Sequence, residues 1–312
     1  AQVTAQAIVA SGQIVASTMA SPAALAELMA DTLFSLAGKV AVVTGGSRGM
    51  GKEICRAFAV AGCNLVIASR KLDGCEQLAQ QIRQECPGRT VWPFASNVSR
   101  WEECQALFDF AYRSFGQVDI LVNNAGGSPL YKSLKDISED YFDKIVGLNL
   151  KGPFRLSALF GSKMCEQAGG SIINVSSDSS LGPSPNAAVY AAAKAGLNHF
   201  TKTFGMAYGP RVRVNCIMPG PFLTDISKAW DVQNQAKAWR RQGALMRAGR
   251  ADEVVGAALY FASAASSFTT GAILEVNGMA AGNGMRDRDH NKNLDFQRDV
   301  VMLMRDPRLS KL

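Results

Sequence analysis

Short apolar runs alternate with longer amphipathic segments along most of this chain. Runs of β-branched and aliphatic residues, such as Lys39–Thr44 and Gly170–Val175, are typical of buried strands. The pattern predicts strands at 39–44, 64–69, 90–95, 118–122, 170–175, 211–217 and 272–276. It predicts helices at 52–61, 72–85, 100–115, 138–164, 187–208 and 251–262. This alternation predicts an α/β fold with a single doubly wound parallel sheet of about seven strands and helices on both faces.

Two terminal segments fall outside this alternation. Residues 1–34 form an N-terminal extension that we expect to be partly helical, because Ser21 and Pro22 precede an apolar run as an N-cap and a first-turn proline would. Residues 283–312 form a mixed-charge C-terminal tail. We therefore expect one domain at 35–282.

Composition limits the classes of function. The 312 residues are 47% hydrophobic and carry a net charge of +7, which suits one large domain with a mildly basic surface. No Lys/Arg-rich run is interleaved with aromatic residues, so we expect no nucleic-acid partner. Seven scattered cysteines without a CxxC pair, and only two histidines, predict neither a disulfide scaffold nor a metal site. No apolar run reaches the roughly 18 residues of a membrane span, so none is expected.

A glycine-rich turn follows the first predicted strand. The segment Thr44–Gly51, TGGSRGMG, joins that strand to the helix expected from Lys52. Strand, glycine turn and helix are the setting of a dinucleotide-binding turn, because glycines let the backbone approach a pyrophosphate and the helix N-terminus offers free N–H groups. A tight turn without a ligand is the alternative that this motif alone leaves open.

Tyr190 and Lys194 are four residues apart in a predicted helix, so their side chains share one face. An ammonium beside a phenol favours the phenolate, and we expect it to lower the pKa of Tyr190. Such a phenol can donate and accept a proton during catalysis. The spacing alone is a weak signal, because many surface helices carry it by chance.

The order TGxxxGxG, then Asn123-Asn124-Ala125-Gly126, then Tyr190 and Lys194 resembles the short-chain dehydrogenase/reductase family over residues 35–282. The pattern is similar to the 3-oxoacyl-carrier-protein reductase and gluconate 5-dehydrogenase types. The resemblance implies a Rossmann-like dinucleotide-binding catalytic domain and an oxidoreductase that interconverts a ketone and a secondary alcohol by hydride transfer. A catalytically silent dinucleotide-binding scaffold or sensor of the same fold is the alternative.

The resemblance implies four catalytic residues. Tyr190 is the general acid/base, and Lys194 tunes it and holds the nicotinamide ribose. Ser177, which lies 13 residues before Tyr190, binds the substrate oxygen, with Ser176 as the alternative. Asn149 matches an asparagine that kinks a helix and anchors a water in a proton relay.

The end of the second predicted strand bears on the choice of cofactor. An NAD enzyme usually places a carboxylate there for the ribose hydroxyls, but this chain has Ser69 followed by Arg70. Arg48 lies in the glycine turn, and two guanidiniums near one point suit a 2′-phosphate. We therefore expect NADP(H), with ordinary solvated surface arginines as the alternative.

Further cofactor contacts follow from the resemblance. Asn97 stands where the family usually has aspartate, so it keeps an acceptor for the adenine region but loses the charge. The full expected set is Gly45, Ser47, Arg48, Gly49, Met50, Gly51, Ser69, Arg70, Asn97, Val98, Asn124, Ala125, Gly126, Tyr190, Lys194, Pro219, Gly220, Phe222 and Thr224.

We expect residues 222–250 to form a lid over a small carbonyl or alcohol substrate. Trp230 and Trp239 suggest an apolar wall. A basic cluster there suits an acyl thioester, although a solvated helix face is the simpler interpretation: Lys237, Arg240, Arg241, Arg247 and Arg250.

The resemblance also implies a homo-oligomer, a dimer or a tetramer. The scattered cysteines favour a cytoplasmic protein. The C-terminal tripeptide Ser310-Lys311-Leu312 offers a peroxisomal alternative.

Overall fold

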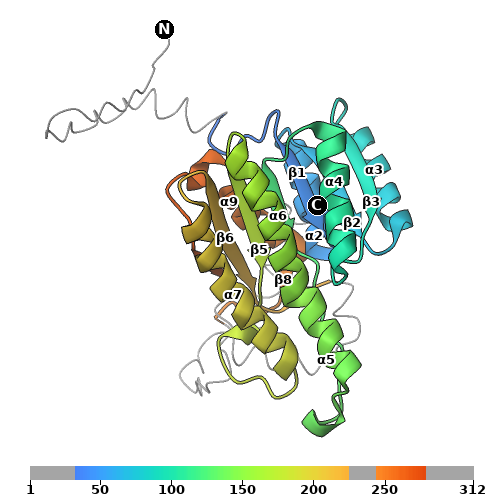
Figure 1. Cartoon of the computed structure of the whole chain (residues 1–312), viewed down its shortest axis with the longest axis vertical. Helices are drawn as coiled ribbons and strands as arrows, with labels where there is room; N and C mark the ends of the chain where they lie inside the picture. The colour runs from blue at the N-terminus through green and yellow to red at the C-terminus, as the bar shows by residue number, and fades with distance from the viewer. Residues whose placement is uncertain (1–31, 225–243, 279–312) are drawn as a thin grey trace, which may run out of the picture.

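A seven-stranded parallel sheet forms the centre of the computed structural model, which describes residues 32–224 and 244–278 (Figure 1). The strand order is β3-β2-β1-β4-β5-β6-β9, and every neighbouring pair is parallel. The strands are β1 (Val40–Thr44), β2 (Asn64–Ser69), β3 (Val91–Ala95), β4 (Ile120–Asn123), β5 (Gly170–Val175), β6 (Val212–Pro219) and β9 (Ile273–Val276). The predicted doubly wound α/β fold is confirmed.

Helices cover both faces of the sheet (Figure 1). One face carries α2 (Gly49–Val60), α3 (Leu72–Glu85) and α9 (Val255–Ala262). The other carries α4 (Trp101–Phe115), α6 (Gly152–Glu166) and α7 (Ala188–Tyr208). Shorter elements are α5 (Glu139–Val146), the π-helical η2 (Gly147–Lys151), and the 3-10 turns η1 (Leu134–Asp136), η3 (Asp178–Ser180), η5 (Ala251–Val254) and η6 (Ala264–Ser266).

Alternate strand residues fill two separate cores. Val43 and Ile67 are fully buried beneath α2, α3 and α9. Their neighbours Val42 and Val66 point the other way, into the core under α4, α6 and α7. Successive side chains on a strand point to opposite faces. Strands covered on both faces therefore appear as unbroken apolar runs in the sequence.

Most predicted boundaries are close to those observed. The segments 64–69, 72–85 and 170–175 match β2, α3 and β5 to the residue. The helix predicted at 138–164 is instead divided into α5, η2 and α6. A small parallel pair, β7 (Phe222–Leu223) with β8 (Gly249–Arg250), was not predicted, since two-residue strands carry no periodic signal. The predicted N-terminal helix and the C-terminal tail lie outside the described residues.

The strand order places the carboxyl ends of β1 and β4 side by side. From β1 the chain proceeds to β2 and β3, and from β4 it proceeds in the opposite direction to β5 and β6. Ligands of open α/β sheets bind in the crevice where the order reverses in this way. This edge is therefore the natural place for the site.

Candidate active site

The glycine turn is tied to the end of β4. Gly45 has φ +62°, a conformation that favours glycine. A Cβ on Gly51 would lie 2.3 Å from the carbonyl oxygen of Gly45, so only glycine fits there. The Asn124 side-chain amide donates to the carbonyls of Thr44, at 2.9 Å, and Gly45, at 3.1 Å. The Thr44 hydroxyl accepts from the backbone N–H of Asn124 and of Ala125, both at 3.1 Å. The backbone of the turn is thus held open toward solvent above the sheet.

Two other loops meet this turn. The Ser47 hydroxyl lies 3.0 Å from that of Ser69, which joins the turn to the end of β2. A Cβ on Gly49 would lie 3.4 Å from the side chain of Thr224, so the loop after β6 reaches the start of α2. A nucleotide on this edge would therefore contact segments from β1, β2 and β6.

Arg48 and Arg70 are both exposed. Each directly follows one member of the Ser47–Ser69 hydrogen bond, so their backbones lie close together. Within residues 32–224 and 244–278, neither guanidinium makes an ion pair. Two cations without a carboxylate partner in that part of the chain remain able to bind an anion.

Asn97 has a structural task. Its side-chain oxygen accepts from the backbone N–H of Ser99 at 3.3 Å and from the Ser99 hydroxyl at 2.7 Å. Its backbone N–H donates to Glu103 at 2.6 Å. The acceptor assigned from the sequence to the adenine region is therefore already engaged in shaping the loop after β3, as Asn side chains often are. Val98, beside it, is buried.

The two serines after β5 differ in role. The Ser176 hydroxyl donates to the carbonyl of Lys194 at 3.2 Å, which fixes β5 to α7. The Ser177 hydroxyl accepts from the backbone N–H of Ser179 and donates to the carboxylate of Asp178, both at 3.2 Å. Asp178 did not belong to the predicted set, and its position next to Ser177 was the signal that could have identified it.

Tyr190 and Lys194 share one face of α7, as their spacing predicts. The Lys194 ammonium lies 5.7 Å from the centre of the Tyr190 ring and donates to the carbonyl of Val175 at 2.7 Å. Burial lowers the pKa of Lys194 to about 8.

Burial raises the pKa of Tyr190 to about 12, although the neighbouring Ser177 hydroxyl opposes that shift. The lowered pKa expected from the sequence is therefore wrong in direction for this state of the protein. The desolvation of the phenolate outweighs the attraction of a lysine whose ammonium is bound to a strand carbonyl.

Asn149 lies in the π-helical turn η2, between α5 and α6. Its amide donates to the carbonyls of Gly127, at 3.0 Å, and Ile145, at 2.9 Å, and its oxygen accepts from the N–H of Gly127. A Cβ on Gly126 would lie 3.0 Å from the Asn149 oxygen and 3.3 Å from the Lys194 nitrogen. Asn149 and Lys194 therefore flank Gly126, near the start of the loop that follows β4. π-Turns often occur at functional sites.

All predicted cofactor residues outside α7 lie at carboxyl ends of strands. They follow β1 (Gly45, Ser47, Arg48, Gly49, Met50, Gly51), β2 (Ser69, Arg70), β3 (Asn97, Val98), β4 (Asn124, Ala125, Gly126) and β6 (Pro219, Gly220, Phe222, Thr224). Their roles toward a cofactor stay predictions.

A model of the short chain dehydrogenase family matches residues 39–235. The chain belongs to this family. It is accordingly an oxidoreductase with a fold that binds a nicotinamide dinucleotide, as the glycine turn and the sheet order already indicated.

Proteins of similar sequence support the assignment to this family. An uncharacterised oxidoreductase of Mycobacterium tuberculosis is 38% identical over 248 residues, which cover 79% of this chain and 93% of the relative. A 3-oxoacyl-[acyl-carrier-protein] reductase of Chlamydia trachomatis is 34% identical, over 78% of this chain and 97% of its own length.

Two solved structures resemble this dehydrogenase closely. A 7α-hydroxysteroid dehydrogenase, complexed with NADH and 7-oxo glycochenodeoxycholic acid, is 32% identical with a TM-score of 0.76, over 80% of this chain and 96% of the other. An NADPH-dependent 3-quinuclidinone reductase from Rhodotorula rubra is 26% identical with a TM-score of 0.76, over 86% and 99%. The two neighbours are named with different nicotinamide cofactors.

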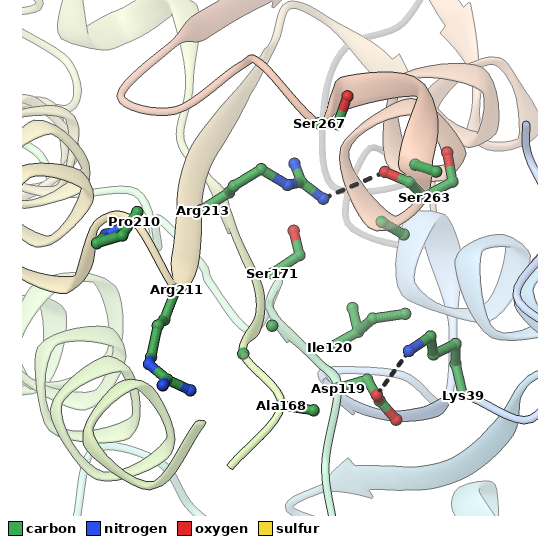
Figure 2. Close-up of a pocket in the computed structure, with 14 residues that line it drawn as sticks. Lys39, Asp119, Ile120, Ala168, Ser171, Pro210, Arg211, Arg213, Ser263 and Ser267 are labelled. Atoms are coloured by element: carbon green, nitrogen blue, oxygen red, sulfur yellow. Dashed lines mark hydrogen bonds and ion pairs between the residues drawn. The ribbon is translucent and has the colours of Figure 1, made fainter. Parts of the chain in front are cut away.

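The dehydrogenase also has a cavity of about 380 Å³ at the opposite, amino edge of the sheet (Figure 2). Lys39 and Asp119 form an ion pair of 3.0 Å on its wall. Arg213 points into the same region, where its guanidinium donates to the carbonyl of Ser263 at 3.2 Å (Figure 2). These residues precede or begin strands, so the cavity is separate from the predicted catalytic residues.

The described ends of the predicted lid are β7 and β8. Arg247 pairs with Glu253 at 2.6 Å, and Arg250 pairs with Asp252 at 2.9 Å. The hydrogen bond from Arg247 lowers the pKa of Glu253 to about 2. These two arginines are therefore paired with carboxylates and are not free members of a basic cluster. Its other members and both tryptophans lie outside the described residues: Trp230, Lys237, Trp239, Arg240 and Arg241.

The described part of the dehydrogenase has three further properties that bear on its function. None of its helices is both long enough and apolar enough to cross a membrane. Residues 32–224 and 244–278 contain no group of three or more side chains suited to hold a metal ion. All seven cysteines lie in these ranges, and each is free.

Proposed function

We propose that this dehydrogenase interconverts a ketone and a secondary alcohol with NADP(H), and that Tyr190 is its general acid/base. The observation that carries the proposal is the arrangement at the carboxyl edge of the sheet. The helix bearing Tyr190 and Lys194 is bonded to the end of β5, next to Ser177, and Lys194 and Asn149 flank Gly126. The glycine turn, bonded to the same β4 loop, suits a pyrophosphate.

The residues would act as follows. The dinucleotide supplies the hydride when it is bound. Tyr190, protonated at neutral pH because its pKa is raised to about 12, donates its proton to the oxygen of the substrate carbonyl as negative charge develops there. Ser177 donates a hydrogen bond to the same oxygen. The Lys194 ammonium stabilises the phenolate that remains and holds the ribose hydroxyls, and Asn149 positions the Gly126 loop against it.

The proposal is tested by following NADPH oxidation with a panel of ketones and 3-oxoacyl thioesters. Turnover of at least one carbonyl compound is expected. Tight NADPH binding without turnover of any member would favour the alternative, a catalytically silent dinucleotide-binding scaffold or sensor.

The choice of NADP(H) rests on Arg48 and Arg70. Replacing both by alanine is expected to raise the KM for NADPH by about 100-fold, because a hydrogen bond to a charged group contributes about 1.5–3 kcal/mol. The KM for NADH should change by less than about threefold. Steady-state kinetics with both cofactors measure this, and Arg113→Ala on α4 is the control. Equal losses with NADH and NADPH would contradict a role for these arginines at a 2′-phosphate.

Ser177 and Ser176 can be separated by alanine substitutions. Ser177→Ala is expected to lower kcat by about 100-fold, the usual cost of removing one donor to a developing oxyanion. Ser176→Ala removes the bond to the Lys194 carbonyl and should lower the free energy of unfolding by about 1 kcal/mol. Thermal melts and kcat of both variants measure the difference. A larger loss of kcat in Ser176→Ala would exchange the two roles.

The remaining predictions extend the proposal. Residues 35–282 would form the catalytic unit, with 222–250 as a lid whose two ends pair as β7 and β8. The protein would be a homodimer or homotetramer, in the cytoplasm or, if the tripeptide at 310–312 is recognised, in the peroxisome. Size-exclusion chromatography with light scattering tests the oligomeric state.

A further inference from the structure

Asp178 is a carboxylate beside the proposed substrate oxygen site. It follows Ser177 directly and accepts that residue's hydroxyl at 3.2 Å. It is half-buried. Among the described residues, it has no ion-pair partner. A carboxylate removed from water without a cation is costly, so its presence at a reacting centre calls for an explanation.

The charge that acts on Asp178 within the described residues is that of a second carboxylate. Burial raises its pKa, the Ser177 hydroxyl and the Ser179 N–H oppose that shift, and the carboxylate of Glu275 on β9 adds to it. On the other side, the charge of Asp178 raises the pKa of Tyr190 on α7. Asp178 therefore lies close enough to the phenol to influence it electrostatically.

We propose that Asp178 selects ketones that carry a cationic nitrogen close to the reacting carbonyl. This inference rests on the proposed reductase function and names its class of substrate. An ammonium in this position supplies the counter-charge that the chain does not provide among its described residues. A negatively charged oxo acid with its carboxylate at the same place is repelled.

The hydrogen bond between Ser177 and Asp178 links the binding of a cationic substrate to catalysis. Without a cation, the Ser177 hydrogen is donated to Asp178. When an ammonium binds Asp178, the carboxylate has another partner and the Ser177 hydrogen can turn to the carbonyl oxygen. A neutral ketone does not release the Ser177 hydrogen from Asp178. Its developing alkoxide charge also lies beside a carboxylate that no cation compensates. The cation should therefore improve turnover as well as binding.

The probe is N-methylated 3-quinuclidinone, compared with its neutral isostere, in which a carbon that bears the same methyl group replaces the nitrogen. The parent ketone is the substrate named for one structural neighbour, and methylation keeps the charge at every pH. We expect the wild-type enzyme to show a kcat/KM about 100-fold higher for the cation, as expected for a desolvated charge pair. In Asp178→Asn that ratio should fall to within about threefold of unity, mainly through loss of activity on the cation.

Equilibrium dialysis of both compounds against the enzyme–NADPH complex gives the same comparison without turnover. Glu166→Gln, which removes an equal charge from an exposed position at the end of α6, should leave the ratio within about threefold of wild type. A wild-type enzyme that binds and reduces both compounds equally, or an Asp178→Asn variant that keeps the preference, overturns the inference. Reduction of the neutral ketone alone would leave the reductase function intact. A cation preference in binding that depends on Asp178, without turnover of either ketone, would instead contradict the function and support the site.

Discussion

Replacing Tyr190 by phenylalanine is expected to lower kcat for ketone reduction by about 1,000-fold. The substitution removes the only proton that the proposed mechanism delivers to the substrate oxygen, and a positioned acid typically contributes 10²–10⁴-fold. The ring remains, so packing around α7 should be preserved. The melting temperature and the dissociation constant for NADPH should therefore stay near the wild-type values while kcat falls.

Tyr260→Phe is the matched control for this experiment. Tyr260 lies on α9, on the other face of the sheet, where its hydroxyl bonds to Thr269 at 2.8 Å. The Tyr260→Phe enzyme should keep full activity. A Tyr190→Phe enzyme that retained more than a tenth of wild-type kcat would remove Tyr190 from the mechanism.

The raised pKa of Tyr190 also determines how activity depends on pH. A phenol with a pKa of about 12 is protonated throughout the neutral range, so it is ready to donate a proton but not to accept one. Below about pH 7, where Lys194 with its pKa of about 8 keeps its charge, reduction should therefore be nearly independent of pH, whereas alcohol oxidation should rise with pH as the phenolate forms. This asymmetry belongs to Tyr190 and should be absent from the residual activity of the phenylalanine variant.

The fold was predictable because its signals are local. The runs that form β1, β2 and β5 are rich in aliphatic residues, and the glycine turn is recognisable within one strand–turn–helix unit. The same holds for the spacing of Tyr190 and Lys194, which depends only on the periodicity of α7.

The properties that could not be predicted depend on tertiary contacts. The sequence shows an asparagine at 97, but only the fold brings Ser99 to its oxygen. Burial and the Val175 carbonyl decide the pKa values of Tyr190 and Lys194. The π-turn around Asn149 and the pairing of Arg247 with Glu253 arise in the same way. These contacts change how a residue acts without changing where the motif places it.

Replacing Lys194 by methionine is expected to stabilise the protein while it inactivates the enzyme. Lys194 is buried, with 2% of its surface exposed, and its pKa of about 8 records the cost of keeping an ammonium there. Methionine fills a similar volume without that charge. The gain is partly offset because the Val175 carbonyl loses its donor at 2.7 Å. We expect the free energy of unfolding at pH 7 to rise by about 2 kcal/mol and kcat to fall by about 100-fold.

The pH dependence of stability shows whether the gain comes from loss of the buried ammonium or from improved packing. An unfolded lysine titrates near pH 10.4, above the folded value of about 8. Between those values the unfolded chain binds more protons, so wild-type stability should rise with pH across that window. The methionine variant should lack this rise. Urea unfolding at pH 7 and pH 9 measures it, with Lys202→Met, an exposed position on the same helix, as the control. If Lys194→Met were less stable than wild type at pH 7, the ammonium would be a net structural support, and its retention would need no catalytic explanation.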